Sequence, residues 1–495
     1  MAEGATALHG ISELRGFFRT NRTPVYFISP IAFNLLGIDR WVRRFYYVNY
    51  FDSFDGGHPC VFVPARSPHP QFGSIEDVCN YLLAHEGLAE FVGAHRHARA
   101  NRDRERGKAV FVFFDEETER RASEAGLDVA LPPAELRHRL DSKIVTTRLG
   151  EEAGVPSVPN VLGRATRYPE LLELAATAGL GDDLVVQTPY GDSGKTTFFV
   201  RGERDWNAAV GEMADQELKV MRRIEPRAVA VEACITRHGT VVGPLMTDLT
   251  GHPELTPYRG GWCGNDIFPG ALSPANRERA LGFTRRLGDR LAREGYRGQL
   301  EVDYLVDAVT DELYLGELNP RLSGISSMTN VSASAYADMP LFLFHLAEYL
   351  DVDYELDVED LRRRWGSDHL TDVWGQIILK EPDDGIELLT DAPRTGIWRM
   401  DDAGRLNFSR PAVDWHGLGD ESEGFYLRIL GPGDYRYRGA DLGILITRTR
   451  LEAPDGCLTD RCRAWINGIR SQFVGSSIEP CEQPPIQDAL AFKTG

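Results

Sequence analysis

The chain has 495 residues, with 55 Lys and Arg against 74 Asp and Glu, which gives a formal net charge of −19 at pH 7. This excess of acid argues against nucleic acid or an anionic membrane as the main partner, although a local basic patch can still bind a nucleotide. No run of about 18 apolar residues is present, so no membrane-spanning helix is expected. A chain of this length should fold into several domains with ample cores.

The seven cysteines are scattered along the chain and odd in number, and none forms a Cys-x-x-Cys pair. This distribution indicates reduced thiols instead of a disulfide framework or a zinc site. The first ten residues lack the basic start and the apolar stretch of a signal peptide. We therefore expect a cytoplasmic protein.

Residues 1–135 alternate expected strands and helices, which predicts an α/β domain with a parallel sheet. The expected strands are residues 25–28, 45–48, 61–63 and 110–114, and the expected helices are 76–83 and 118–125. Pro132 and Pro133 end this pattern. A single helix from residue 134 to about 154, which carries Lys143, is expected to follow.

A glycine-rich loop characterises the next predicted unit, residues 136–240. The loop, Gly191 to Thr197, lies between expected strands at 184–187 and 198–200. Its small residues let backbone N–H groups approach an anion, but the G-x-x-x-x-G-K spacing of a P-loop is absent. The alternative is an ordinary glycine hairpin. Further strands are expected at 218–224, 228–235 and 240–244.

The most informative pattern lies in the third predicted unit, residues 241–350, after a helix that Ser273 and Pro274 should open. Apolar residues alternate with Glu301 and Asp303 in one strand, a polar turn follows at 307–312, and a second strand leads to Glu317 and Asn319. A hairpin would bring these oxygen-bearing side chains together. Such ligands suit Mg²⁺ held against nucleotide phosphates.

Two questions stay open at this hairpin. Either Glu301 or Asp303 could supply the ligand from the first strand. The alternative to a metal site is an edge hairpin with solvated acids, which the abrupt end of the second strand at Asn319-Pro320-Arg321 disfavours.

Residues 351–480 are rich in short expected strands and turns, which predicts a β-rich C-terminal domain. A proline-rich tail at 481–495 follows. The strands are expected at 375–380, 396–400, 425–430 and 443–449, with a closing helix at 463–472.

The segment Glu317-Leu318-Asn319-Pro320-Arg321 behind an acidic strand resembles the metal-binding end of the ATP-grasp superfamily, which includes biotin carboxylase and amino-acid and peptide ligases. The segment from Leu140 through Lys143 to Pro156 is similar to the part of those enzymes whose lysine binds phosphate. The resemblance covers about residues 20–350 and rests on the order of the motifs. It implies an α/β (α+β) ATP-grasp fold with a preATP-grasp domain, a biotin-carboxylase-like architecture and a lid-like C-terminal domain at residues 351–480.

The resemblance also implies the site residues. Magnesium or manganese would be held by Asp303, Glu317 and Asn319, and ATP by Lys143, Gln187, Ser193, Gly194, Lys195, Arg223 and Glu232. Arg321 and Lys195 would be catalytic, since a guanidinium can stabilise the charge of an acyl phosphate or a tetrahedral intermediate.

Each of these roles has a plainer alternative. Lys143 could be a solvated helix residue, Glu232 an exposed strand acid and Arg321 the partner of a metal-site acid. One position departs from the family pattern, because Gln187 stands where the strand before the glycine loop usually ends in lysine. Lys195 is expected to compensate.

The implied activity is that of an ATP- and Mg-dependent ligase, which activates a carboxylate as an acyl phosphate and joins it to an amine. The substrates would be small molecules of amino-acid or peptide type, and a homodimer is expected by analogy. One alternative is a carboxylase that uses bicarbonate, which Gln187 and the lack of a Met-Lys-Met segment disfavour. The other is a non-catalytic nucleotide-binding regulator, which the intact acids disfavour.

Overall fold

The computed structural model describes residues 7–66, 72–95, 106–191, 196–213, 216–258, 260–365 and 372–478. The N-terminal part is built around five parallel strands in the order β4-β3-β2-β5-β6. Every residue of the central strand β2 is buried, as expected for a parallel strand covered on both faces. The elements are β2 (Val25–Ser29), β3 (Phe45–Asn49), β4 (Val61–Phe62), β5 (Gly107–Val110), β6 (Leu127–Val129), α1 (Gly10–Thr20), α2 (Ile75–Ala84), α3 (Glu86–His95) and α4 (Glu116–Glu124).

This part confirms the predicted α/β pattern but differs from it in two places. β5 ends at Val110, where the predicted strand begins, and residues 111–114 stay buried as they lead into α4. The helix predicted over 134–154 is two helices, α5 (Ala134–Asp141) and α6 (Lys143–Glu152). Ser142 has extended backbone angles and its hydroxyl accepts a hydrogen bond from the Val145 amide at 3.5 Å. It therefore caps a new helix that begins at Lys143.

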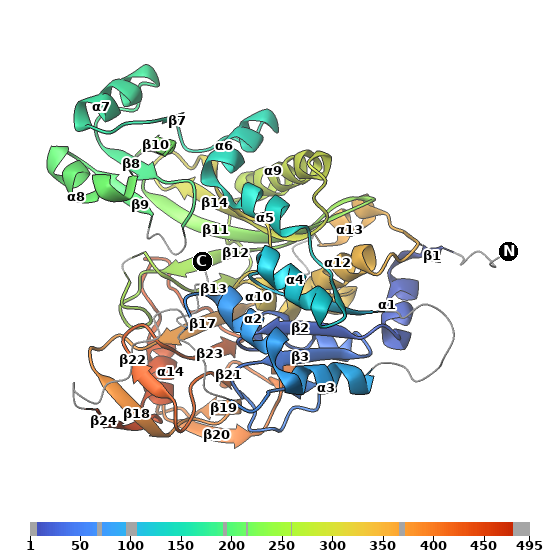
Figure 1. The fold of residues 1–495 in the computed structure, drawn as a ribbon. Helices are drawn as coiled ribbons and strands as arrows, with labels where there is room; N and C mark the ends of the chain where they lie inside the picture. Colours follow the sequence, from blue (N-terminus) through green and yellow to red (C-terminus); the bar gives the residue numbers. More distant parts are fainter. Residues whose placement is uncertain are drawn as a thin grey trace.

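An antiparallel four-stranded sheet with two helices forms what we call the small-sheet unit, residues 160–222. Its strand order is β7-β10-β8-β9, and it has an apolar cluster of its own. It projects from the rest of the molecule at the upper left of Figure 1. The elements are β7 (Asn160–Gly163), α7 (Tyr168–Thr177), β8 (Leu184–Gln187), β9 (Thr197–Val200), α8 (Glu203–Met213) and β10 (Leu218–Arg222).

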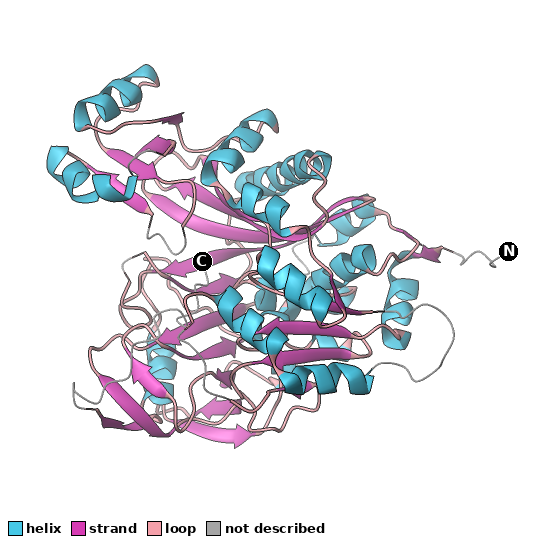
Figure 2. Ribbon diagram, viewed as in Figure 1, coloured by secondary structure: helices cyan, strands magenta, loops and turns pink. Residues whose placement is uncertain are grey.

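The largest sheet has ten strands and runs through the body of the molecule (Figure 2). Its order is β15-β14-β11-β12-β13-β17-β23-β21-β19-β20, and β13 pairs with β17. The sheet that holds the acidic hairpin is thus continued by five described strands after residue 350: β17, β19, β20, β21 and β23. The strands are β11 (Pro226–Thr236), β12 (Gly239–Thr250), β13 (Trp262–Ile267), β14 (Gly298–Asp307), β15 (Leu313–Asn319), β17 (Trp374–Lys380), β19 (Gly396–Met400), β20 (Leu406–Arg410), β21 (Glu423–Arg428) and β23 (Asp441–Thr447).

Two helices cover opposite faces of the β11–β14 part of this sheet. α9 (Pro274–Arg293) begins at the predicted cap, since the Ser273 hydroxyl accepts from the Asn276 amide at 3.3 Å. Its Leu287 and Leu291 belong to the same apolar cluster as Val302. α12 (Leu341–Tyr349) contacts β11 and β14 from the other side, the side toward which Glu301 and Asp303 point.

The remaining elements complete the body. None of the described helices is both long and apolar enough to cross a membrane. The elements are β1 (Leu8–His9), α10 (Ser326–Val331), α11 (Ala333–Ala337), β16 (Tyr354–Glu355), α13 (Val358–Trp365), β18 (Ile386–Asp391), β22 (Tyr435–Tyr437), α14 (Asp460–Arg470) and β24 (Val474–Ser477).

Candidate active site

The predicted hairpin is confirmed, and its register sets two acids face to face. Asp303 on β14 lies directly opposite Glu317 on β15, and the Asn319 amide donates to Asp303 Oδ2 at 3.1 Å. Gly316 is an extra residue at this point, so β15 carries a β-bulge. With regular pairing, Glu317 would lie opposite Val302 and face the α9 core. The bulge instead places both acids on one face.

Buried carboxyl groups gather around this pair. Burial raises the pKa of Asp303 well above its ordinary value, and the nearby Glu301 and Glu317 raise it further. Burial likewise raises the pKa of Glu301 to about 8 and that of Asp248, on β12, well above normal. Glu301 Oε2 is buried and has no hydrogen-bond partner among the described residues. Carboxylates this close repel one another, so the cluster favours a bound cation.

The donor set fits magnesium in chemistry. Asp303, Glu317 and Asn319 offer two carboxylates and one amide, the hard oxygen ligands that Mg²⁺ prefers. In this structure the Asn319 amide oxygen accepts from Arg321 Nη2 at 2.9 Å. That oxygen has a second lone pair, so Asn319 could keep this hydrogen bond and still bind the metal.

Lys143 connects α6 to both the hairpin and the start of the glycine-rich loop. Its ammonium is buried and donates to Glu317 Oε1 at 2.6 Å and to the Gly191 carbonyl at 2.8 Å. Because helix N-termini favour negative charge, a lysine at the first position of α6 is unfavourable by itself. An anion bound beside it would offset this cost.

Lys219 is a second buried lysine, and the sequence analysis missed it. It lies on β10, directly opposite Gln187 on β8, and only 2% of it is exposed. Burial lowers its pKa to about 8, although Glu317 opposes this shift. The signal in the sequence was a lone lysine between apolar neighbours in a short strand, Leu218-Lys219-Val220.

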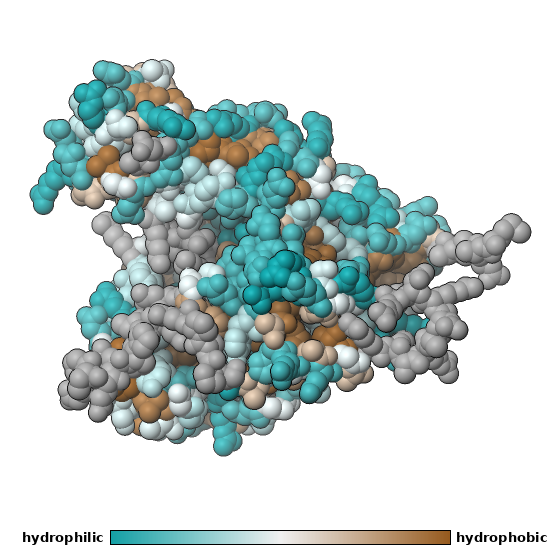
Figure 3. Space-filling model, in the orientation of Figure 1, coloured by the Kyte–Doolittle hydropathy of each residue, from teal (hydrophilic) through white to brown (hydrophobic). Residues whose placement is uncertain are grey.

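Lys219 and the acids line an inner cavity of about 220 Å³, whose wall includes neither Lys143 nor Asn319. It joins an outer cavity of about 1240 Å³ between β8–β10 and the segment after β10, and both cavities have Gln187, Met221, Gly260 and Leu305 in their walls. Figure 3 shows this face of the molecule indented between the small-sheet unit and the body. The inner cavity is also lined by Lys219, Asp248, Trp262, Glu301, Asp303, Glu317 and Gly324.

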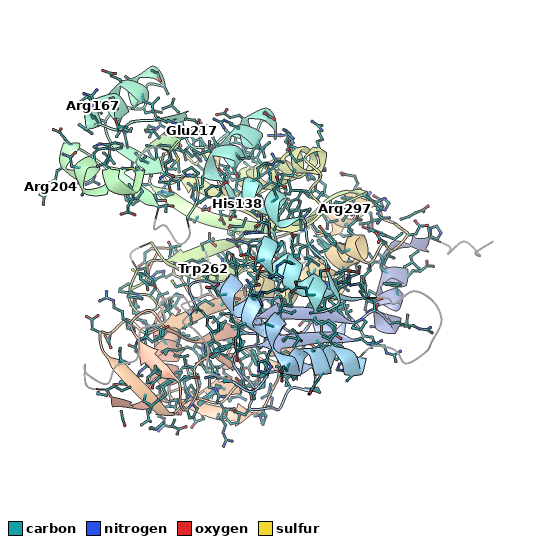
Figure 4. The ribbon with its side chains drawn as sticks, in the orientation of Figure 1. His138, Arg167, Arg204, Glu217, Trp262 and Arg297 are labelled. Carbon is teal, nitrogen blue, oxygen red and sulfur yellow. The ribbon has the colours of Figure 1, made fainter. Side chains whose placement is uncertain are left out.

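The segment after the hairpin is held in place from two distant parts of the chain. From the N-terminal part, Asn34 Nδ2 donates to the Ser323 carbonyl at 2.7 Å. From β17, Gln376 Nε2 donates to the Gly324 carbonyl at 3.0 Å. Gly324 packs under the ring of Trp262, which a Cβ at that position would meet at 2.5 Å. Figure 4 labels Trp262 on the body, below the small-sheet unit.

Comparison with known proteins decides the fold. No family model matches the chain, and no curated protein matches its sequence. Solved structures do match. Biotin carboxylase from Campylobacter jejuni is 14% identical with a TM-score of 0.59, and 92% of each chain is covered.

Two further structures agree. The biotin carboxylase domain of 2-oxoglutarate carboxylase from Hydrogenobacter thermophilus, solved with MgADP and bicarbonate, is 14% identical with a TM-score of 0.57 over 92% of this chain and 91% of that one. The N5-carboxyaminoimidazole synthase from Aspergillus clavatus, solved with ADP and its ribonucleotide, is 10% identical with a TM-score of 0.52 over 86% and 94%. This chain has the ATP-grasp fold.

The ATP-grasp framework brings most of the predicted side chains together. Gln187, Asp303 and Glu317 line the inner cavity, while Arg223 lines the outer one, where its guanidinium lies 5.3 Å from the centre of the Phe199 ring. The predicted loop residues Ser193, Gly194 and Lys195 lie outside the described residues, as does the tail at 481–495.

Two predicted positions differ from the expected ATP-grasp contacts. Glu232 is fully buried under α10, where the Ser326 hydroxyl donates to it, and it lines neither cavity. Arg321 is also buried and lines neither cavity. Its guanidinium lies 4.2 Å from the Phe113 ring centre and contacts Asn319, so its described contact is with a candidate metal ligand.

Proposed function

We propose that this chain is an ATP-dependent ligase that activates a carboxylate as an acyl phosphate and joins it to an amine. The observation that carries the proposal is one cavity with opposed acids on one wall and buried lysine on another. A nucleotide triphosphate needs both, because cations neutralise its phosphates and acids hold the accompanying metal. The neighbouring outer cavity has room for the nucleoside.

In this proposal, each residue of the site has a separate role. Backbone groups of residues 221–224 would contact the base in the outer cavity, and Gln187 would orient the phosphates where the cavities meet. Lys143 would exchange its bond to Glu317 for a phosphate oxygen. Arg321 would keep Asn319 in place, as a positioning residue.

Asp303, Glu317 and Asn319 would hold magnesium or manganese, which neutralises charge on the transferring phosphoryl group. With that ion bound, the pKa values of the cavity acids would return toward their ordinary range. Closure of the small-sheet unit over the cavity would exclude water, which protects an acyl phosphate from hydrolysis.

The acid and the amine are proposed to be small molecules of amino-acid or peptide type. A carboxylase using bicarbonate is the second candidate, since two of the compared structures are biotin carboxylase chains. A cytoplasmic location and a homodimer belong to the proposal as well.

The test is ADP release by the purified chain with ATP, Mg²⁺ and a panel of amino acids and amines, with bicarbonate as a separate arm. Hydroxylamine should trap the acyl phosphate from the true acid. Glu317→Gln should abolish turnover, whereas Glu312→Gln, an exposed acid in the turn of the same hairpin, should behave as the wild type. Equal turnover in both variants, or ATP turnover with bicarbonate alone, would overturn the ligase proposal.

A further inference from the structure

The position of Gln187 leaves the inner cavity without a cation at the end of β8. On the adjacent strand β10, however, Lys219 lies directly opposite Gln187 in the antiparallel register. Residues directly opposite in such a pair project from the same face of the sheet. Both side chains line the inner cavity.

Lys219 has no partner of its own among the described residues. The nearby Glu317 makes its ion pair with Lys143, whose ammonium lies 2.6 Å from Glu317 Oε1. No hydrogen bond or ion pair joins the ammonium of Lys219 to another described residue, although the residue is almost fully buried. A buried ammonium without a counterion is costly, so this wall of the cavity lacks an anion.

We propose that Lys219 binds the nucleotide phosphates, and so supplies from β10 the positive charge that position 187 lacks. The inference rests on the proposed function, because it assumes that the cavity takes a nucleotide. In this proposal, the positive charge comes from β10 instead of the end of β8, but it still lies in the wall of the inner cavity. Lys219 and Lys143 then approach the phosphates from different elements, β10 and α6.

Returning a lysine to position 187 on β8 tests the inference. The variants are Lys219→Gln, which removes the ammonium, and the double variant Gln187→Lys with Lys219→Gln, which returns a lysine to β8. Lys108→Gln is the matched control, because it removes a half-buried lysine of the N-terminal sheet that pairs with Asp128. The readout is calorimetric affinity for Mg-ATP, Mg-ADP and adenosine, which lacks phosphates.

We expect Lys219→Gln to weaken Mg-ATP and Mg-ADP binding by about tenfold or more, as for loss of one charge-assisted hydrogen bond. Adenosine affinity should stay unchanged, and the double variant should regain most of the lost affinity. The control should bind all three ligands as the wild type does. Circular dichroism and thermal unfolding would show that each variant is folded.

Two results would overturn the inference alone, provided that the wild type binds Mg-ATP. One is unchanged nucleotide affinity in Lys219→Gln. The other is a loss that extends equally to adenosine and is not restored by the double variant, which would make Lys219 a structural residue. A wild type that binds no nucleotide would instead overturn the proposed function.

Discussion

The small-sheet unit and the acidic hairpin supply opposite charges to one cavity. The hairpin contributes Asp303 and Glu317, whereas the small-sheet unit contributes Lys219 and the neutral Gln187. The two walls also differ in how they are held. The hairpin belongs to a ten-stranded sheet braced by distant segments, while the small-sheet unit has a separate apolar cluster and projects from the body (Figure 1). The wall proposed to hold the metal thus belongs to the large sheet, whereas the wall proposed to bind the phosphates belongs to a unit with its own apolar cluster.

The largest effect on turnover should come from a change in the acidic hairpin. Asp303→Asn is expected to reduce turnover by about a thousandfold or more, because an amide is a weaker metal ligand than a carboxylate and leaves phosphate charge unneutralised. Adenosine binding should persist, since the outer cavity is untouched. Steady-state ADP release and calorimetry measure the two quantities. Turnover within threefold of the wild type would show that the hairpin does not hold the metal.

Exchange of Glu317 and Leu318 tests whether the strand face positions the acid. In the double variant Glu317→Leu with Leu318→Glu, the carboxylate would lie opposite Val302 and turn toward the core under α9. We expect turnover to fall at least about a hundredfold and the folded state to lose roughly 1–3 kcal/mol, because a carboxyl group would enter an apolar cluster. Activity assays and denaturant unfolding measure both. A fully active exchange variant would mean that register does not position Glu317.

On the wall formed by the small-sheet unit, Lys219→Met should raise stability while it lowers nucleotide affinity. Burial holds the folded pKa of Lys219 at about 8, below the ordinary value of 10.5, so its charge opposes folding at neutral pH. Its removal should stabilise the nucleotide-free protein by about 2 kcal/mol at pH 7, and this gain should shrink as the pH rises from 8 toward 10.5. Unfolding curves at several pH values measure it. A destabilised variant at pH 7 would contradict an unpaired buried charge.

The smallest effect concerns contact between the N-terminal part and the body, away from both walls. Burial alone would raise the pKa of Asp414, but hydrogen bonds from His416 and Arg40 lower it to about 2. Because the folded pKa lies below the ordinary value of 3.8, this stabilisation is complete above about pH 4 and is lost as the pH falls toward 2. Asp414→Asn should cost about 1 kcal/mol at pH 7, allowing for the half-exposed Arg40.

The difference between wild type and Asp414→Asn should disappear by about pH 2, while turnover at pH 7 stays normal. Acid unfolding followed by fluorescence measures the first quantity and ADP release the second. A gap in stability that persists at pH 2 would show that the carboxylate is not its source.

The sequence by itself determined the features that depend on local pattern. The alternation of apolar residues with Glu301 and Asp303 predicted the hairpin and its two faces. Ser273 and Pro274 predicted where α9 begins. These could be predicted because strand periodicity and helix caps act between near neighbours. The order of the motifs likewise predicted the ATP-grasp fold.

Tertiary structure decided what depends on register and on distant contacts. A single-residue bulge at Gly316 chose the face of Glu317, and strand pairing alone set Lys219 opposite Gln187. Burial of Glu232 under α10 followed from packing that its own strand does not encode. The physical reason is that a pairing register depends on the partner strand, which one-dimensional periodicity does not specify.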